Sequence, residues 1–393
     1  MNPDWTYKRI GDVCLVERGG SPRPIDDYIT DAPDGINWIK IGDTSDSMFI
    51  TKTAQKIKPE GMKKSRYVEP GDFLLSNSMS FGRPYILKID GCIHDGWLVL
   101  RDGQGLFDKR FLYYYLSSPT TYRRFAAMAV GGVVNNLNSE MVRKVEVPVP
   151  SMDEQREIAN LLDKLNSVIE SIRRELSLLD QLIKARFVEM FGDPIINDRG
   201  WQQITLLGSL EADRTVTYGI VQTGDEFEGG IPVFRPIDIA GGHVPKRDEL
   251  KKTDPLISAQ YKRTLLKGNE LLITVRGSVG ETFQTTEEFE GCNVGRNIVP
   301  LVTDSNKVCQ RFLQELFAQD AIKNWLKGIT KGIALQGLNM GEFKEMPVVM
   351  PPLAMQKVFV DFALQVDKSK AVVQEALDRA QTLFDSLMQQ YFG

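Results

Sequence analysis

The clearest pattern of apolar and polar positions lies between residues 150 and 192. Apolar residues recur there at every third or fourth position, and counting in sevens from Ile158 gives Leu165, Ile172 and Leu179. This spacing gathers the apolar side chains on one face of a helix and leaves polar residues on the opposite face. The pattern therefore predicts an amphipathic helix of some 40 residues.

Both ends of this helix carry their own signals. Ser151 and Glu154 have the spacing of a capping box, in which each side chain accepts a hydrogen bond from the backbone N–H of the other residue. Gly192, followed by Asp193 and Pro194, is a typical stop, because glycine adopts the left-handed conformation easily and proline cannot continue a helix. We therefore expect the helix to begin near Ser151 and to end near Gly192.

The end of the chain repeats the same stripe. Phe359 follows Ile158 by 201 positions, and the later members of the stripe have apolar counterparts at the same distance. A single helix of this kind is usually an ordinary packing helix. Two helices in one register, each closing one half of the chain, are better explained as partners in a coiled coil. The residues predicted to pair the helices are Ile158, Leu165, Ile172, Leu179, Phe359, Val366, Val373 and Ala380.

The repeat also covers the segments before the helices. Residues 71–75 (GDFLL) correspond to 268–272 (GNELL), and residues 137–138 (LN) correspond to 338–339 (LN). The chain is therefore a duplication of one unit, in which a globular segment is followed by a long helix. The predicted divisions are a first globular segment at 1–150, a central helix at 151–192, a second globular segment at 193–350 and a C-terminal helix at 351–393.

Each globular segment has a mixed pattern. Short alternating or apolar runs predict strands at 37–41, 72–76, 85–89 and 97–101, and a longer periodic run predicts a helix from Asp108 to Met128. Strand and helix do not alternate regularly, so the predicted fold class is α+β.

Length and composition narrow the class of protein. The 393 residues suggest two or three domains, and a net charge of −4 argues against a uniformly basic nucleic-acid binder. The four cysteines form no CxxC or Cys/His pattern, so we expect a reducing compartment, buried thiols and no metal site. The longest apolar run, 126–134, is too short to cross a bilayer, and the start of the chain does not resemble a signal peptide. The chain is therefore expected to be cytoplasmic and to have no membrane partner.

Catalytic motifs are missing from the sequence. It contains neither the GxxxxGK[ST] phosphate loop nor the GxGxxG fingerprint, and its nearest match to an adenine methyltransferase motif, residues 350–353 (MPPL), lacks both the polar and the aromatic residue. His94 and Asp95 are interpreted as loop residues, because the second copy has Val294 and Gly295 there. We therefore predict no catalytic residues and no cofactor in this chain.

Basic residues recur at the same place in both copies. Six lie between Lys52 and Arg66, and six lie between Lys246 and Arg263. Charged runs are usually solvated loops. Because these runs recur in both copies, contact with nucleic-acid phosphates explains them as well as a solvated loop does.

The loop after the repeated GDFLL/GNELL segment differs between the copies. Residues 76–83 read SNSMSFGR, whereas residues 273–280 read ITVRGSVG. Asn can read adenine and Arg can read guanine through paired hydrogen bonds, so this difference suits two units that read two different short sequences. Drift in an unimportant loop explains it equally well.

The chain resembles the specificity subunits of type I restriction-modification enzymes over its whole length. The similarity rests on residues 147–163 (VPVPSMDEQREIANLLD), a weaker copy at 348–364, the loop 19–22 (GGSP), and the GDFL and GNEL segments. The second copy departs from the family pattern at Asn269 and lacks the Glu-Gln-Arg triplet, since residues 354–357 read AMQK.

This resemblance implies two target-recognition domains at the ends of an antiparallel pair of helices. It implies that the chain reads a bipartite, asymmetric target in double-stranded DNA, does no catalysis, and seats two methyltransferase subunits. It further implies S-adenosylmethionine as the methyltransferase cofactor, and ATP and Mg for restriction/translocase subunits that join through the complex.

Two hypotheses compete with this reading of the chain. One is a duplicated nuclease or methylase with an unrecognised site, and the other is a coiled-coil adaptor that binds no DNA.

Candidate DNA contacts follow from the loops and the basic runs. In the first copy the candidates are Ser21, Arg23, Lys40, Lys52, Lys56, Lys63, Lys64, Arg66, Asn77, Ser78 and Arg83. In the second copy they are Gln222, Arg235, Lys251, Lys252, Thr274, Arg276, Arg296 and Asn297.

Overall fold

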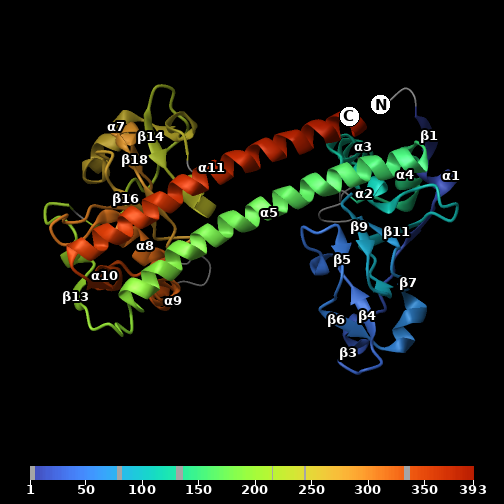
Figure 1. Cartoon of the computed structure of the whole chain (residues 1–393), viewed down its shortest axis with the longest axis horizontal. Coiled ribbons are helices and arrows are strands. Elements are labelled where there is room, and N and C mark those ends of the chain that lie inside the picture. Colours follow the sequence, from blue (N-terminus) through green and yellow to red (C-terminus); the bar gives the residue numbers. More distant parts are fainter. Residues whose placement is uncertain (1–4, 78–81, 130–135, 215, 243–244, 332–336) are drawn as a thin grey trace. The chain divides into compact units, whose positions relative to one another are not determined.

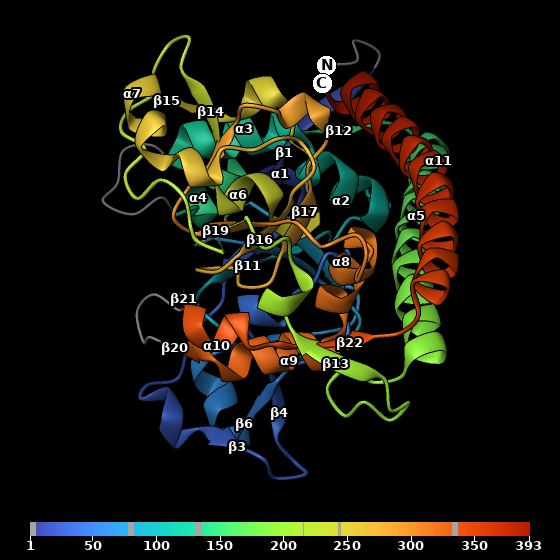
Figure 2. The ribbon, with the colours of Figure 1, turned by 90° about the vertical axis from the view of Figure 1, so that its left-hand side faces the viewer.

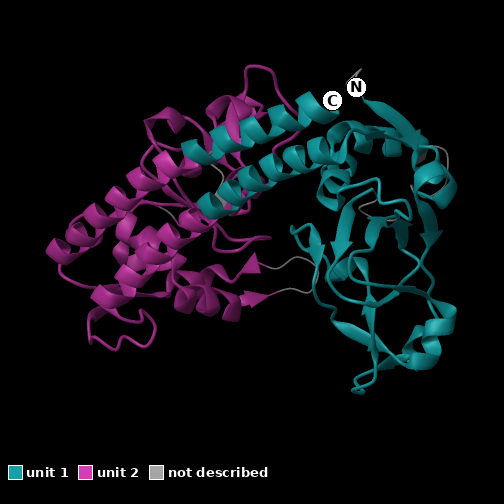
Figure 3. Cartoon of the chain, turned by 45° about the vertical axis from the view of Figure 1, so that its right-hand side comes forward, with its two compact units in different colours: residues 1–173, 375–393 teal, residues 174–374 magenta. Residues whose placement is uncertain are grey.

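A computed structural model describes all residues except 1–4, 78–81, 130–135, 215, 243–244 and 332–336. It divides into two compact units, shown in Figure 3: unit 1 comprises Met1–Arg173 with Glu375–Gly393, and unit 2 comprises Arg174–Gln374. Each unit therefore contains one globular segment and a stretch of both long helices.

Unit 1 is built on two five-stranded sheets, in the orders β2-β11-β8-β9-β5 and β3-β6-β4-β10-β7, and on the antiparallel pair β1-β12. Short helices cover the first sheet and lead back to the pair (Figure 1). The strands are β1 (Thr6–Arg9), β2 (Leu15–Arg18), β3 (Ile29–Thr30), β4 (Ile36–Ile39), β5 (Phe49–Ile50), β6 (Gln55–Ile57), β7 (Arg66–Val68), β8 (Phe73–Ser76), β9 (Pro84–Leu87), β10 (Gly91–Ile93), β11 (Trp97–Arg101) and β12 (Glu146–Val149). The helices are α1 (Ile10–Val13), α2 (Lys109–Ser117), α3 (Pro119–Ala129) and α4 (Ser139–Arg143).

Unit 2 has smaller sheets with the same core pairings. Its orders are β15-β14-β18, β17-β16-β19, β13-β22 and β20-β21. Strand β22 leads directly into the last helix (Figure 2). The strands are β13 (Gln202–Thr205), β14 (Ile231–Phe234), β15 (Lys251–Thr253), β16 (Leu271–Thr274), β17 (Thr282–Gln284), β18 (Asn293–Val294), β19 (Ile298–Leu301), β20 (Thr330–Lys331), β21 (Gly337–Leu338) and β22 (Pro347–Met350). The helices are α6 (Pro236–Ile239), α7 (Pro255–Ser258), α8 (Gln310–Ala318), α9 (Asp320–Gly328) and α10 (Met340–Lys344).

The element order confirms both the α+β class and the duplication. Helices α2, α4 and α5 begin at Lys109, Ser139 and Met152, and α8, α10 and α11 begin 201 positions later. In both units the strand pair β4-β10 or β14-β18 is parallel. The two globular segments therefore share one framework.

The predicted single helix from 108 to 128 is wrong. Helix α2 ends at Ser117, Ser118 is extended with φ −65° and ψ 146°, and α3 starts at Pro119. Proline has no N–H to continue a helix and disfavours helical geometry at the preceding residue. The Ser118 hydroxyl instead accepts a hydrogen bond from the Thr121 amide at 3.2 Å and caps the new helix.

The two long helices are α5 (Met152–Phe191) and α11 (Leu353–Phe392). Only half of the predicted capping box forms at the start of α5. The Ser151 hydroxyl accepts from the Glu154 amide at 3.3 Å, but the Glu154 carboxylate accepts from the Trp5 indole N–H at 2.8 Å. The predicted stop is confirmed, because Gly192 has φ +76° directly after the helix.

Within each unit the two helices run antiparallel. In unit 2, Asp180 pairs with Lys370 at 2.5 Å, and further along α5 the Phe187 ring lies 5.5 Å from that of Phe359. In unit 1, Arg173 donates to the Gln381 side chain at 3.3 Å. Of the predicted pairing residues, Ile158, Phe359 and Val366 are buried, while Leu165, Ile172, Leu179, Val373 and Ala380 are half-buried. Heptad coiled-coil packing along the helices stays a prediction.

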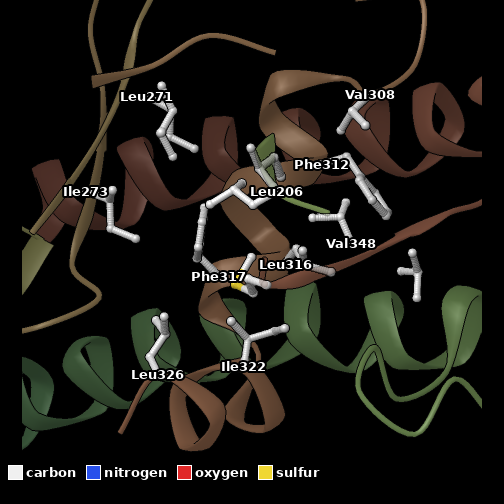
Figure 4. Close-up of a cluster of buried hydrophobic side chains, with 14 of the residues drawn as sticks. Leu206, Leu271, Ile273, Val308, Phe312, Leu316, Phe317, Ile322, Leu326 and Val348 are labelled. Carbon is white, nitrogen blue, oxygen red and sulfur yellow. The ribbon is translucent and has the colours of Figure 1, made fainter. Parts of the chain in front are cut away.

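The ends of the helices belong to the globular cores. The core of unit 2, some of which is drawn in Figure 4, joins Phe187 and Phe191 of α5 to Phe312 of α8 and Phe359 of α11. In unit 1, Ile158 of α5 and Phe392 of α11 pack in the same cluster as residues of the first sheet. The buried side chains at the ends of the helices therefore pack in the same clusters as residues of the globular segments.

Two further features bear on the expectations above. The four cysteines are free, and three are buried, while Cys309 is half-buried. Among the described residues, no helix is both long and apolar enough to span a membrane.

Candidate nucleic-acid interface

The loop that differs most between the copies is held by the same backbone frame in both. After β8, the Ser76 amide donates to Arg83 O at 3.0 Å and the Gly82 amide donates to Ser76 O at 2.7 Å. After β16, Thr274 makes the same two bonds with Glu281 and Gly280, both at 2.9 Å. A shared hairpin therefore carries different residues in each unit.

This frame corrects two predicted contacts. Thr274 is fully buried, and its hydroxyl accepts from the Glu281 amide at 3.0 Å, just as Ser76 accepts from Arg83. Asn77 is 3% exposed, and its side-chain amide donates to Asp95 O at 2.9 Å. Both side chains are buried and hydrogen-bonded within the fold, so neither is available to read a base. The candidate Ser78 lies outside the described residues.

In unit 1 several candidates meet around Asp95, at the end of β10. The Ser21 hydroxyl donates to Asp95 Oδ1 at 2.8 Å, and Arg23 Nη2 lies 3.4 Å from Oδ2. The backbone oxygen of Asp95 also accepts from Arg18 Nε at 3.0 Å. Asp95 therefore connects two loops that are far apart in sequence.

The Asp95 cluster opens on a hollow of about 680 Å³. Lys40, which follows β4, lines the hollow and donates from Nζ to Gln55 Oε1 at 2.6 Å. Trp38 and His94 contribute aromatic surface to the same hollow. The structure thus gathers Ser21, Arg23 and Lys40 at one place.

The carboxylate in this cluster stays ionised. Burial by itself would raise the pKa of Asp95, but the hydrogen bonds from Ser21 and the backbone and the nearby charges of His94 and Arg18 hold it below its usual value. Burial lowers the pKa of His94, although Asp95 opposes that shift. At neutral pH the cluster therefore contains a negative Asp95 beside a positive Arg23.

Unit 2 has the same loop but not the same cluster. A Cβ at Gly19 would lie 2.2 Å from His94 O, and a Cβ at Gly219 would lie 1.9 Å from Val294 O. Both glycines are therefore required where the loop crosses the end of β10 or β18. The pairing of β11 with β8 and of β19 with β16 places Arg296, and not the predicted Gly295, where unit 1 has Asp95. Val221 stands where unit 1 has Ser21.

The remaining candidates of unit 2 fall into two groups. Gln222, Arg276 and Arg296 are exposed. Arg235 is tied to Asp238, with Nη2 2.9 Å from Oδ1. Asn297 is half-buried, and its buried Oδ1 has no hydrogen-bond partner among the residues that the structure describes. Arg276 pairs by its backbone with Gly337, next to a segment that the structure does not describe.

The two basic runs lie on and next to strands β6 and β7 in unit 1 and strand β15 in unit 2. In unit 1, Lys52, Lys63, Lys64 and the loop residue Arg83 are exposed, while Lys56 of β6 and Arg66 of β7 are half-buried. Arg66 pairs with Glu17 at 2.9 Å. In unit 2, Lys251 and Lys252 of β15 are half-buried, and Lys251 donates to Gly224 O at 2.5 Å. Strands β6 and β7 of the first run pair with β4 and β10, and strand β15 of the second run pairs with β14.

Sequence reasoning missed Asp95 as the centre of the cluster, together with Arg18, Trp38 and Gln55. The available signal for Asp95 was an acidic residue in the short loop after the repeated Gly-Cys strand. The pairing of β4 with β10 brings Trp38 to the site, and the pairing of β6 with β4 brings Gln55; the sequence reveals neither pairing. Among the described residues, no group of three or more His, Cys, Asp or Glu side chains could hold a metal.

Comparison with known proteins gives a consistent family. The model of the type I restriction modification DNA specificity domain matches residues 2–181 and 218–379. The specificity subunit of the type I restriction enzyme EcoBI from Escherichia coli is 24% identical over 386 residues, which cover 91% of this chain and 80% of that protein.

Solved structures agree on the fold. A structure from work on complex assembly and conformational transition of the type I R-M system has a TM-score of 0.56 at 18% identity and covers 100% of this chain and 98% of its own. The type I restriction-modification S subunit from M. genitalium has a TM-score of 0.50 at 16% identity, with 100% and 97% covered.

Proposed function

Because the chain belongs to the family of type I restriction-modification DNA specificity domains, we propose that its two globular segments read the two halves of one bipartite, asymmetric DNA target. The chain is the recognition subunit of such a system, and it acts with DNA and with the other subunits of the complex. A subunit that directs the restriction of foreign DNA would act in the cytoplasm, in defence against phage.

The observation that carries this proposal is the common frame with different loops. Bonds such as Leu137 N to Asn77 O and Leu338 N to Val275 O, both 2.9 Å, recur between the units. The exposed residues on that frame differ, with Arg276 and Arg296 in unit 2 and the Asp95 cluster in unit 1. Two different readers on one frame suit a target whose two half-sites differ.

The long helices suit the second task, which is to seat two methyltransferase subunits. They keep exposed apolar side chains that no globular core covers, for example Val168 at 49%, Leu182 at 46% and Val372 at 68% exposure. Apolar side chains that a partner subunit would cover are one explanation for such exposure. Leu182 and Leu383 are equivalent positions, which suits one identical partner for each unit.

The chemistry would then lie in the partners. The methyltransferase subunits would use S-adenosylmethionine to methylate adenine, and the restriction/translocase subunits would use ATP and Mg. This chain would contribute position and sequence choice only.

The experiment is co-expression of the chain with its methyltransferase, followed by the methylome of the host. We expect one asymmetric, interrupted motif that disappears when this chain is deleted. Methylation that persists without the chain, or turnover of S-adenosylmethionine by the isolated chain, would contradict the proposal.

A further inference from the structure

Arg23 differs from the basic candidates Lys40 and Arg66 in how it is held. Its side chain is 81% exposed, yet its Nη2 lies 3.4 Å from Asp95 Oδ2. Lys40 Nζ is bonded to Gln55, and Arg66 is less exposed, at 42%. A guanidinium has five N–H donors, so a carboxylate that takes one leaves the others for a ligand.

Asp95 is itself fixed from several sides. Its Oδ1 accepts from Ser21 Oγ at 2.8 Å, and its backbone oxygen accepts from Asn77 Nδ2 at 2.9 Å and Arg18 Nε at 3.0 Å. Its side chain remains 43% exposed. A carboxylate fixed in this way at the surface can orient a neighbouring arginine.

We propose that Asp95 positions Arg23 to read a guanine in the half-site of unit 1. The major-groove edge of guanine offers two acceptors, O6 and N7, which match the paired N–H groups of one arginine. Holding the guanidinium before binding reduces the side-chain freedom that is lost on binding. Arg23 is the reader in this proposal, and Asp95 is a positioning residue. The inference rests on the proposed DNA-recognition function.

The charge of the pair favours base reading over phosphate binding. Affinity for phosphates comes from unpaired positive charge and does not depend on sequence. Arg23 beside an ionised Asp95 is close to neutral, so it adds little to that attraction, whereas exposed Lys63 and Lys64 suit it well.

Direct reading of a cytosine amino group by Asp95 is the competing arrangement. A carboxylate can accept from cytosine N4. In this structure, however, Ser21 occupies Oδ1 and Arg23 faces Oδ2. The geometry therefore favours Arg23 as the contacting residue.

Unit 2 provides an internal control. It has Arg296 in place of Asp95 and Thr223 in place of Arg23, so the carboxylate of the pair is missing there. Changes to the pair should alter recognition of one half-site and leave the other unchanged.

The test is a double-mutant cycle on the full chain bound to its methyltransferase. The probes are DNA duplexes that carry the methylome-defined target and its single-base variants. Arg23→Ala should lower discrimination at one guanine of one half-site by roughly 10- to 100-fold. Asp95→Asn should lower it at the same guanine, and should add nothing in the Arg23→Ala background. Binding of Asp95→Asn to non-target DNA should not weaken, because a negative charge is removed.

Two variants act as controls. Asp31→Asn removes an exposed carboxylate of the same domain and should leave discrimination unchanged at every position. Ser21→Ala frees Asp95 without touching either charge and should reproduce some of the Asp95→Asn effect. Unchanged discrimination at the other positions of the same half-site shows in each case that unit 1 is folded.

Several results would overturn the inference. They are a half-site without guanine, unchanged discrimination in Arg23→Ala, a uniform loss on all sequences, and additive losses in the double mutant. In each of these cases the complex still binds a specific target, so the proposed function survives. A wild-type complex without any sequence preference would instead overturn the proposed function itself.

Discussion

The two globular segments are alike where they meet the helices and unlike where they carry the recognition loops. Gln155 is 1% exposed and its side chain bonds Asp108 N, Leu106 O and Pro150 O at 2.9–3.1 Å. Gln356 is fully buried and makes the same three bonds, with Cys309, Lys307 and Pro351. At the other end of the fold, the counterpart of the acidic Asp95 is the basic Arg296.

This contrast separates two kinds of constraint. The helix attachment is a set of buried polar bonds, and a buried donor or acceptor that loses its partner is costly, so such a set tolerates little change. The recognition loops are exposed on a frame that bonds through the backbone, so their side chains can change without cost to the fold. One chain can therefore attach two equal helix ends and still read two different sequences.

The largest expected effect comes from the aromatic contacts that attach the helix ends. The ring of Phe111 lies 5.5 Å from Phe392, and the ring of Phe312 lies 5.0 Å from Phe191. Phe111→Ala and Phe312→Ala should each lower the free energy of unfolding by about 3–5 kcal/mol. Urea unfolding of each variant measures this, with the exposed Phe227→Ala as the control that should change it by less than about 0.5 kcal/mol. A large loss of unfolding free energy in only one of the two variants would mean that the helix attachments of the two units are not equivalent.

The glutamine attachments should come next. Gln155→Ala and Gln356→Ala each leave one buried amide and two carbonyl groups without their partner, so each should cost roughly 2–3 kcal/mol. Urea unfolding again measures the effect, and the exposed Gln365→Ala serves as the matched control. Two effects that differ by several-fold would mean that the attachments are not alike.

Much of this frame was predictable from the sequence, because it rests on local signals. The helical stripes, the Gly192 stop and the repeat at 201 positions all lie within continuous segments. The break before Pro119 was missed although the proline was visible, since the apolar period continues across it. The Asp95 cluster could not be predicted, because it joins Ser21, Asn77 and Asp95 through sheet contacts. The burial of Thr274 likewise depends on the hairpin around it.

A smaller effect is expected from a reader in unit 2. Arg276 is exposed on the variable hairpin, so Arg276→Ala should relax one position of the second half-site, at a cost of about 1–3 kcal/mol if it pairs with guanine. The methylome of a strain carrying the variant measures this. An unchanged motif would remove Arg276 from the readers, whereas an altered first half-site would contradict the separation of the units.

The smallest expected effect is a pH dependence confined to unit 2. Burial raises the pKa of Glu315 above its usual value of 4.5, although Arg311 opposes the shift, and the equivalent residue in unit 1 is the neutral Tyr114. Ionising Glu315 therefore costs stability as the pH rises from its unfolded pKa through its higher folded pKa, and below both values there is no cost. Glu315→Gln should gain stability relative to the wild type as the pH rises from about 4 to about 7.

The free energy of unfolding of the wild type and of Glu315→Gln, measured from about pH 4 to about pH 7, tests this prediction. Tyr114→Phe should show no such gain. A relative gain for Glu315→Gln that grows on acidification would contradict the sign of the shift.

The central claim is that a common frame carries two independent readers. It is tested most directly by a full-length chain in which residues 6–149 replace residues 202–350, so that both long helices remain and both globular segments are copies of the first. The methylome of a strain with this chain and its methyltransferase should show an interrupted palindrome built from the first half-site alone. The original asymmetric motif, or a complex that assembles but methylates no specific sequence, would contradict the account.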